Sequence, residues 1–323
     1  MNDARNNDKK RPCLSIVIPC YNEESVLKDT ILQLLSLLDK MEVDNSIAYS
    51  SFLLCVNDGS RDSTWDIIQK YHSVDNRVCG VNLAVNVGHQ NALIAGLTVA
   101  SDHSDIMVTI DADLQDNPNV IVEMTQKYLD GADIVYGVRN SRATDSWFKR
   151  TTALAFYSLM QNMGVNTIYN HADFRLMSLR AVKQLLKYRE RNLFIRGLIP
   201  LIGYNTESVY YDRSKRLAGE SKYPLTKMLG LALDGITSFS VKPIRFVTYL
   251  GIAFVIGASL TLIWVLYEYL NSNVVEGWSS LILSIWFCSG CMLIGLGIIG
   301  EYIGKIYTEA KARPRYNIER ILM

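Results

Sequence analysis

The sequence predicts an α/β domain in which helices cover both faces of a parallel sheet, followed by a membrane-embedded segment. Short apolar runs alternate with helical patterns through the first two-thirds of the 323 residues, and continuous apolar strands are typical of parallel sheets that are buried on both faces. Two stretches without charged residues, 246–267 and 277–300, follow in the last third. The length suits one large domain with an appendage.

The predicted strands and helices alternate along the chain. Strands are expected at 14–19, 52–57, 78–83, 106–110 and 134–138, and helices at 26–38, 64–71, 90–100 and 120–129. In a parallel sheet covered by helices, ligands bind at the carboxyl ends of the strands. The polar residues that follow each strand are therefore the first candidates for a functional site.

The composition excludes some classes of protein. Apolar residues make up 49% of the chain and the formal net charge is +1, so the basic excess of a nucleic-acid-binding protein is missing. The cysteines show no pattern of a disulfide framework, which agrees with a reducing cytosol. Cys288 and Cys291 have the CxxC spacing but lie in an apolar run of membrane length, where packing of small side chains is a better explanation than zinc or redox chemistry.

Each of the two uncharged stretches is long enough to cross the hydrocarbon core of a membrane as a helix. A buried helix of a soluble core is the alternative, but two such lengths in tandem favour the membrane. The loop between them contains Glu268 and Glu276 and no Lys or Arg. The basic residues lie on the outer flanks: Lys242 and Arg245 on one side, and Lys305, Lys311, Arg313 and Arg315 on the other. By the positive-inside rule, both flanks and the amino-terminal domain are expected in the cytoplasm.

The stretch after Pro224 has apolar residues at helical spacing from Leu225 to Phe239, with Lys222 and Lys227 nearby. We expect an amphipathic helix in the headgroup region, and the alternative is a helix packed on the soluble domain. The expected parts of the chain are a disordered lead-in at 1–12, the α/β domain at 13–222, the juxtamembrane helix at 223–242, a two-helix membrane hairpin at 243–304 and a cytoplasmic tail at 305–323.

Three polar clusters follow predicted strands and are expected to line one crevice. They are SIVIPCYNEE at 15–24, VNDGSRDST at 56–64 and DADLQDNP at 111–118. Asp111 and Asp113 come directly after a buried strand, where paired carboxylates are costly unless a positive charge neutralises them. Their oxygens suit Mg²⁺ or Mn²⁺ with diphosphate oxygens in the remaining positions, and Gln115 offers a neutral oxygen. Asp58 either accepts a hydrogen bond from a base or ribose or serves its Asp-Gly turn alone.

These clusters resemble those of family-2 glycosyltransferases of the GT-A fold. More narrowly, they are similar to the bacterial bactoprenol-phosphate glucosyltransferases and the related dolichyl-phosphate mannose synthases. The similarity continues through ADFRLMS at 172–178, ERNLFIRG at 190–197, RLAGESKYP at 216–224, LDGITSFS at 233–240 and GEYIG at 300–304. It covers nearly the whole chain from residue 14 to about 316, and the order of the domain, amphipathic helix and two spans matches the bactoprenol branch.

The resemblance implies a role for individual residues. Pro19, Tyr21, Glu23 and Asp58 would hold the nucleoside, Asn86 would lie near the donor, and Asp111, Asp113 and Gln115 would bind Mg²⁺ or Mn²⁺, with Asp111 also close to the donor. Asp173 stands where relatives place a catalytic base, Arg139, Arg175 and Arg196 are candidates for phosphate contacts, and residues 216–223 would form a flexible loop over the site. Because a phosphate acceptor is already anionic at neutral pH, Asp173 could instead orient Arg175. The chain departs from the pattern at Asn117 and at His89, where relatives often carry Lys.

The resemblance implies an inverting transfer of a hexose, glucose from UDP-glucose, to undecaprenyl phosphate at the bacterial inner membrane. UDP-N-acetylglucosamine, UDP-galactose and GDP-mannose remain open as donors. A processive polysaccharide synthase is disfavoured because the chain has no Arg-Trp pair, and a dinucleotide oxidoreductase because no G-x-G-x-x-G follows the first strand. A non-catalytic lipid-phosphate scaffold is disfavoured by the three intact acids Asp58, Asp111 and Asp113. Gly300 and Gly304 would allow close helix approach, either between the two spans or between subunits of a homo-oligomer.

Overall fold

The computed structural model describes residues 11–113, 115–140, 171–191, 193–212 and 278–323, with scattered positions between 244 and 267. The expected α/β fold is confirmed: every strand predicted from the sequence is present, and so are the four predicted helices. The strands are β1 (Leu14–Cys20), β2 (Phe52–Asn57), β3 (Val78–Leu83), β4 (Ile106–Thr109), β5 (Ile134–Arg139), β6 (His171–Ser178), β7 (Thr206–Tyr211) and β8 (Ile318–Leu322). The helices are α1 (Leu27–Val43), α2 (Thr64–Val74), α3 (His89–Ala100), α4 (Val120–Leu129), α6 (Leu179–Leu186), α7 (Ile195–Leu201) and α10 (Trp278–Lys311).

The strands form one sheet in the order β7-β5-β6-β4-β1-β2-β3-β8. The expectation of a purely parallel sheet is wrong, because β6 lies antiparallel between β4 and β5, and β8 lies antiparallel against β3. The connection through α4 places β5 one strand away from β4, and β6 fills the space between them. The central strands β1, β2, β3 and β4 are parallel, as predicted, so their carboxyl ends share one edge of the sheet.

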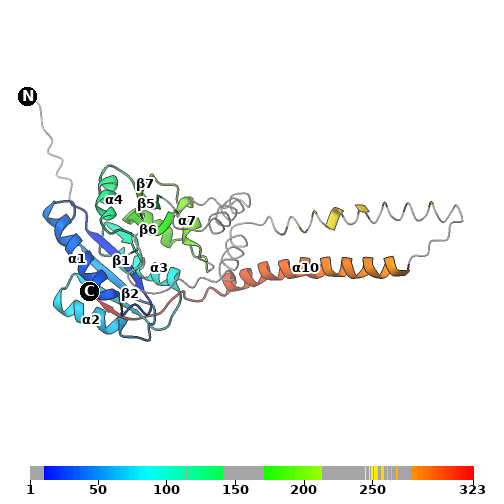
Figure 1. Ribbon diagram of the computed structural model, residues 1–323, viewed down its shortest axis with the longest axis horizontal. Helices are drawn as coiled ribbons and strands as arrows, with labels where there is room; N and C mark the ends of the chain where they lie inside the picture. The colour runs from blue at the N-terminus through cyan, green and yellow to red at the C-terminus, as the bar shows by residue number, and fades with distance from the viewer. Residues whose placement is uncertain are drawn as a thin grey trace, which may run out of the picture. The chain divides into compact units, whose positions relative to one another are not determined.

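Helices cover both faces of the sheet, as Figure 1 shows for α1, α2, α3 and α4. On one face, α1, α2 and α4 pack on the main hydrophobic core, which contains Ile16, Ile31 and Met124. On the other face, α3 packs against β1 and β2. Its Gly96 lies so close to the sheet that an added Cβ would be 2.5 Å from Val17 Cγ1 and 2.6 Å from Val56 Cγ2. This close packing fixes the position of α3, whose first residue reaches the carboxyl edge of the sheet.

The carboxyl terminus of the chain is a strand of the same sheet. The chain divides into two units: a sheet domain, which includes Arg313–Met323, and a second unit, which includes Pro224–Ala312. β8 pairs with β3 in the register Gly80↔Leu322 to Leu83↔Ile318, with an irregularity at Asn82 and Leu83. The expected boundary of a cytoplasmic tail at 305–323 therefore changes, because α10 continues to Lys311 and the residues after it belong to the sheet domain. Figure 1 shows the carboxyl terminus beside the sheet.

One helix among the described residues is long and apolar enough to cross a membrane. It is the part of α10 from Phe287 to Lys311, which has 25 residues and buries almost none of its surface within the structure. By length and composition alone, this stretch overlaps the second expected span at 277–300, but it begins and ends later. The first expected span lies mostly outside the described residues, and so do the juxtamembrane helix at 223–242 and the loop at 216–223. These three expectations stay predictions.

Candidate functional site

The turn after β2 is stabilised by the carboxylate of Asp58, which lies in the turn itself. Asp58 is 2% exposed, and its carboxylate accepts hydrogen bonds from the backbone N–H groups of Val87 at 2.7 Å and Gly88 at 3.0 Å. Asn86 donates from Nδ2 to the Asp58 carbonyl at 3.1 Å. Burial raises the pKa of Asp58, and the two hydrogen bonds from the 87–88 backbone oppose the rise. Asp58 and Asn86 therefore lie side by side, and the Asp58 carboxylate joins the turn to the loop before α3.

The remaining candidates for nucleoside contact lie at the end of β1. Pro19 pairs with Val56 inside the sheet, whereas Tyr21 is 45% exposed. The backbone N–H of Glu23 donates to Thr64 Oγ1 at 2.9 Å, which fixes this segment to the start of α2. The backbone of Asp58 donates to the Cys20 carbonyl at 2.9 Å, so the ends of β1 and β2 are joined at the same edge. Tyr21 is the member of this group that offers an accessible ring.

Asp111 stands at the carboxyl end of β4 among several other acids. Burial raises the pKa of Asp111, nearby His89 lowers it, and repulsion from Asp173, Asp116 and Asp113 raises it further. Its side chain is nevertheless 42% exposed, so one side of the carboxylate is open. Asp113 accepts from the backbone N–H of Gln115 at 3.2 Å, and Gln115 itself is 3% exposed. Crowded carboxylates with an open side provide the hard oxygen ligands that a divalent cation requires.

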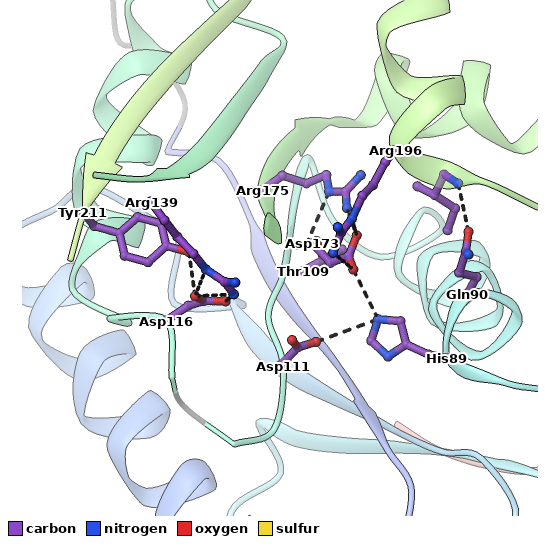
Figure 2. Close-up of polar contacts among 11 residues, drawn as sticks. His89, Gln90, Thr109, Asp111, Asp116, Arg139, Asp173, Arg175, Arg196 and Tyr211 are labelled. Atoms are coloured by element: carbon purple, nitrogen blue, oxygen red, sulfur yellow. Dashed lines mark hydrogen bonds and ion pairs between the residues drawn. The ribbon is translucent and has the colours of Figure 1, made fainter. Parts of the chain in front are cut away.

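Asp173 on β6 is clamped by two guanidinium groups. Arg175 donates from Nη2 to Asp173 Oδ1 at 2.5 Å, while Arg196 on α7 donates from Nε to Oδ1 at 3.0 Å and from Nη2 to Oδ2 at 2.8 Å. Burial alone would raise the pKa of Asp173, but Arg196 and Arg175 outweigh it and hold the pKa far below its usual range. Asp173 is thus permanently ionised near neutral pH. The clamp brings together three of the predicted site residues (Figure 2).

The two arginines of this clamp differ in exposure. The side chain of Arg175 is fully buried, and its Nη1 has no hydrogen-bond partner among the residues that the structure describes. Burial lowers the pKa of Arg175, and the charge of Asp173 opposes this effect. The side chain of Arg196 is 38% exposed. The partly exposed guanidinium of Arg196 can therefore reach a phosphate, whereas the buried guanidinium of Arg175 serves as an internal ion-pair partner of Asp173.

His89, the first residue of α3, connects the acids of β4 and β6. Its Nε2 is 3.8 Å from Asp111 Oδ1 and 4.0 Å from Asp173 Oδ2, distances that are too long for direct hydrogen bonds. Figure 2 shows the imidazole beside these two carboxylates, with a dashed line to each. The next residue, Gln90, accepts from the backbone N–H of Ile195 at 2.9 Å, which joins the start of α3 to the start of α7. His89 thus lies beside Asp111 and Asp173, two of the predicted site residues.

Arg139 at the end of β5 makes a separate cluster with Asp116 and Tyr211. It donates to Asp116 Oδ1 from Nε at 3.1 Å and from Nη2 at 2.9 Å, and the Tyr211 hydroxyl donates to the same oxygen at 2.6 Å. In Figure 2 this cluster lies apart from Asp173 and Arg196, across Asp111. Asp116 is 2% exposed, so the end of the segment that carries Asp111 and Asp113 is anchored to β5 and β7.

Several of these residues have no role that the sequence alone indicates. Asp116 lies within the cluster at 111–118, and its burial could not be inferred from its neighbours in the sequence. Thr109 donates to the Asp173 carbonyl at 2.5 Å, and Gln90 accepts from the backbone at the start of α7. A single Thr or Gln belongs to no motif that would reveal these contacts. Tyr211 lies on β7, a strand that the apolar pattern of the sequence does not predict.

Comparisons with known proteins identify the family of the chain. Residues 15–186 match the family described as Glycosyl transferase family 2. The chain is 50% identical to "Uncharacterized glycosyltransferase YkoT" of Bacillus subtilis (strain 168), over 96% of this chain and 92% of that protein. It is 38% identical to "Prophage bactoprenol glucosyl transferase homolog" of Escherichia coli (strain K12), over 95% and 99%, and 39% identical to "Bactoprenol glucosyl transferase" of Shigella phage SfX, over 95% and 98%. The sheet with its edge of acids and arginines is the GT-A domain of a glycosyltransferase, and the chain belongs to glycosyl transferase family 2.

Proposed function

We propose that this glycosyltransferase moves glucose from UDP-glucose to undecaprenyl phosphate, with inversion at the anomeric carbon. The observation that carries the proposal is the meeting of an open, crowded carboxylate, Asp111, with the clamp of Asp173 and Arg196 at one edge of the sheet. The first suits a nucleoside diphosphate with its cation, and the second suits a phosphate acceptor. The relatives named as bactoprenol glucosyl transferases, similar over almost their whole length, support the same acceptor and sugar.

The donor would bind across the ends of β1, β2 and β4. Tyr21 offers an exposed ring for the base, Pro19 and Glu23 shape the segment around it, and the Asp58 turn with Asn86 forms the floor. Asp111 and Asp113 would hold Mg²⁺ or Mn²⁺, with Gln115 as a neutral neighbour. Among the described residues, no group of three or more His, Cys, Asp or Glu side chains could hold a metal ion alone, which fits a cation that takes its other ligands from diphosphate and water. Bound there, the cation would neutralise charge on the leaving diphosphate.

The acceptor phosphate would approach Arg196. One of its oxygens forms the new bond to the anomeric carbon while the bond from that carbon to the diphosphate oxygen breaks, so UDP leaves with the electron pair. The second pKa of a phosphate monoester is about 6, so the attacking oxygen is already ionised near neutral pH. Asp173, with its strongly lowered pKa, is a poor proton acceptor and instead orients Arg196 and Arg175. Arg139, held by Asp116, is the candidate for contacts at the diphosphate end.

The connectivity of the chain supports a membrane hairpin. Residues on both sides of Pro224–Ala312 belong to the sheet domain. A segment that leaves a folded domain and returns to it crosses a membrane an even number of times if it crosses at all. The described residues contain one membrane-length stretch, in α10, and we propose a second crossing within 246–267, with the sheet domain and the carboxyl terminus in the cytoplasm of a bacterial cell. We also propose a homo-oligomer that forms through close helix packing at Gly300 and Gly304.

A transfer assay on the full chain tests the function. Purified protein in vesicles with undecaprenyl phosphate is incubated separately with radiolabelled UDP-glucose, UDP-N-acetylglucosamine, UDP-galactose and GDP-mannose, and the lipid phase is counted. We expect label from UDP-glucose, a complete loss in excess chelator, and a loss in Asp113→Asn with unchanged folding. Label from another donor alone would replace glucose, and full activity in chelator would refute the metal requirement. Tight lipid-phosphate binding without transfer from any donor would favour the scaffold alternative.

A further inference from the structure

We infer that the carboxyl-terminal strand β8 positions the donor-binding turn, through a chain of hydrogen bonds that ends on Glu319. The inference rests on the proposed donor site at the Asp58 turn and adds to it a residue far away in the sequence. The chain of hydrogen bonds, here called the amide relay, consists of the Ser60 backbone N–H and the side chains of Asn57, Asn82 and Glu319.

The amide relay crosses three neighbouring strands. The Ser60 N–H donates to Asn57 Oδ1 at 3.3 Å, Asn57 Nδ2 donates to Asn82 Oδ1 at 2.7 Å, and Asn82 Nδ2 donates to Glu319 Oε2 at 2.8 Å. The backbone register agrees, because Asn57 lies opposite Asn82 at the carboxyl ends of β2 and β3. Asn57 is 3% exposed and therefore depends on protein partners for its hydrogen bonds.

The direction of the amide relay is set by its last member. An ionised carboxylate can only accept hydrogen bonds, so Glu319 requires the NH₂ group of Asn82 to face β8. The Asn82 oxygen then faces Asn57, which presents its own NH₂ group to Asn82 and its oxygen to the Ser60 N–H. Every donor points the same way, and hydrogen bonds aligned in a chain polarise and strengthen one another. Glu319 thus selects the amide orientation that holds the turn.

The turn at the other end contributes directly to the proposed donor site. The Ser60 hydroxyl accepts from the Asn22 N–H at 3.0 Å, and Asn22 Oδ1 accepts from the Arg61 N–H at 2.9 Å, so the turn also orders the segment between Tyr21 and Glu23. Loosening Ser60 would therefore disturb the segment that carries Tyr21 and Glu23, the candidates for contacts with the nucleoside. Glu319 acts through other residues and is a positioning residue, not a catalytic one.

β8 itself is docked by contacts outside the amide relay. The Ala84 N–H donates to the Asn317 carbonyl at 3.0 Å, and Arg315 donates to the Tyr188 carbonyl at 2.5 Å. The Tyr316 hydroxyl forms a hydrogen bond with Thr98 Oγ1 at 3.0 Å. Because these contacts do not involve the Glu319 side chain, its substitution can break the relay while the strand stays in place.

The test uses four variants of the full chain in detergent: Glu319→Gln, Glu319→Ala, Glu319→Lys and Arg320→Gln. Gln can still present an acceptor oxygen, Ala presents nothing, and Lys presents only donors and opposes the direction of the amide relay. Arg320, an exposed neighbour on the same strand, is the matched control. UDP-glucose and UDP binding are measured by titration calorimetry, and amide hydrogen exchange is followed at Ser60, at Val87 and along β8.

We expect the dissociation constant for UDP-glucose to rise in the order Gln, Ala, Lys. The rise for Lys should be about threefold to tenfold, which corresponds to about one net hydrogen bond. Exchange at Ser60 should become faster while β8 stays protected, and Arg320→Gln should resemble the unaltered chain. Equal binding and equal exchange at Ser60 in all four variants would overturn the inference.

Two outcomes are kept apart by the design. If β8 loses protection in the Glu319 variants, Asn82→Leu decides, because it interrupts the amide relay on β3 without altering β8; unchanged exchange at Ser60 in that variant would refute the relay. If the unaltered chain binds no nucleotide sugar, the proposed function fails, while exchange at Ser60 still shows whether Glu319 holds the turn.

Discussion

At the scale of single residues, the charge of Asp173 holds the site together. Arg175 is fully buried, and a buried charge without its partner is strongly destabilising. We predict that Asp173→Asn lowers the free energy of unfolding by about 3–5 kcal/mol. Since the folded-state pKa of Asp173 lies far below the unfolded value of about 3.9, its contribution is fully present above that pH and is lost progressively as the pH falls from there toward the folded-state pKa. Thermal unfolding at neutral pH measures the first effect, and a series that extends well below the unfolded pKa measures the second.

Arg196→Gln is the matched control for Asp173→Asn. Its side chain is 38% exposed, and Asp173 keeps Arg175 as a partner when Arg196 is removed. The loss of stability should therefore stay within about 1 kcal/mol, whereas the KM for the lipid acceptor should rise if Arg196 receives the phosphate. A stability loss as large as that of Asp173→Asn would show that the clamp needs both arginines, and an unchanged acceptor KM would remove Arg196 from the acceptor site.

His89 lies near the two acids Asp111 and Asp173 of the site. Its Nε2 is within 4.0 Å of both carboxylates, whose charges repel each other. We predict that His89→Ala lowers kcat/KM about tenfold, the effect of removing one favourable contact of about 1.4 kcal/mol. His89→Lys should retain most activity, because a Lys amine can also reach between the acids. Equal losses in both variants would show that the imidazole ring itself is required.

At the scale of helices and strands, the short apolar runs of the sequence predict the five strands β1 to β5. Strands β1 to β5 are continuous apolar runs, and the polar ends of β1, β2 and β4 share one edge, as expected for parallel strands. β6 escaped the pattern because Asp173 and Arg175 interrupt its apolar residues, and the buried Arg175 is balanced by Asp173, which also binds Arg196 on α7. β8 escaped because its pairing with β3 depends on a partner more than two hundred residues away, which no local pattern reports.

The turn between β2 and α2 is the element whose geometry most depends on one glycine. Gly59 has φ +63°, and an added Cβ would lie 2.6 Å from the Asn86 backbone N. We predict that Gly59→Ala pushes the 85–88 loop away from Asp58 and raises the KM for the donor about tenfold or more. Gly203 has a similar φ of +73° with nothing within 4 Å of an added Cβ, so Gly203→Ala is the matched control for backbone strain alone. A donor KM that changes equally in both variants would contradict a specific role for the turn.

At the scale of the whole molecule, the first and the last described strands, β1 and β8, belong to the same sheet. The larger part of the second unit, Pro224–Ala312, is therefore inserted between β7 and β8 and is not a carboxyl-terminal appendage. A chain that ends at residue 222 loses β8, exposes the edge of β3, and loses the contacts of Arg315 and Tyr316. An exposed strand edge is also a site for aggregation. A catalytic part that is separated from its proposed anchor must therefore keep β8.

The last prediction tests that division with two shortened chains. One ends at residue 222, and the other joins residue 222 to Arg313–Met323 through a flexible Gly/Ser linker of about 20 residues. We expect the joined chain to be soluble and to bind UDP-glucose as the full chain does, and the chain without β8 to bind weakly or to aggregate. Calorimetry and size-exclusion chromatography measure these properties.

Transfer by the joined chain then shows what the insertion contributes. Under the proposed function, anchoring would confine the enzyme to the surface that holds undecaprenyl phosphate, and tethering alone can raise apparent affinity roughly a hundredfold. The joined chain should therefore transfer glucose to a short water-soluble polyprenyl phosphate at a rate near that of the full chain, and poorly to undecaprenyl phosphate in vesicles. Equal loss on both acceptors, with UDP-glucose binding intact, would show that residues between 224 and 312 complete the acceptor site instead of only bringing the sheet domain to the membrane.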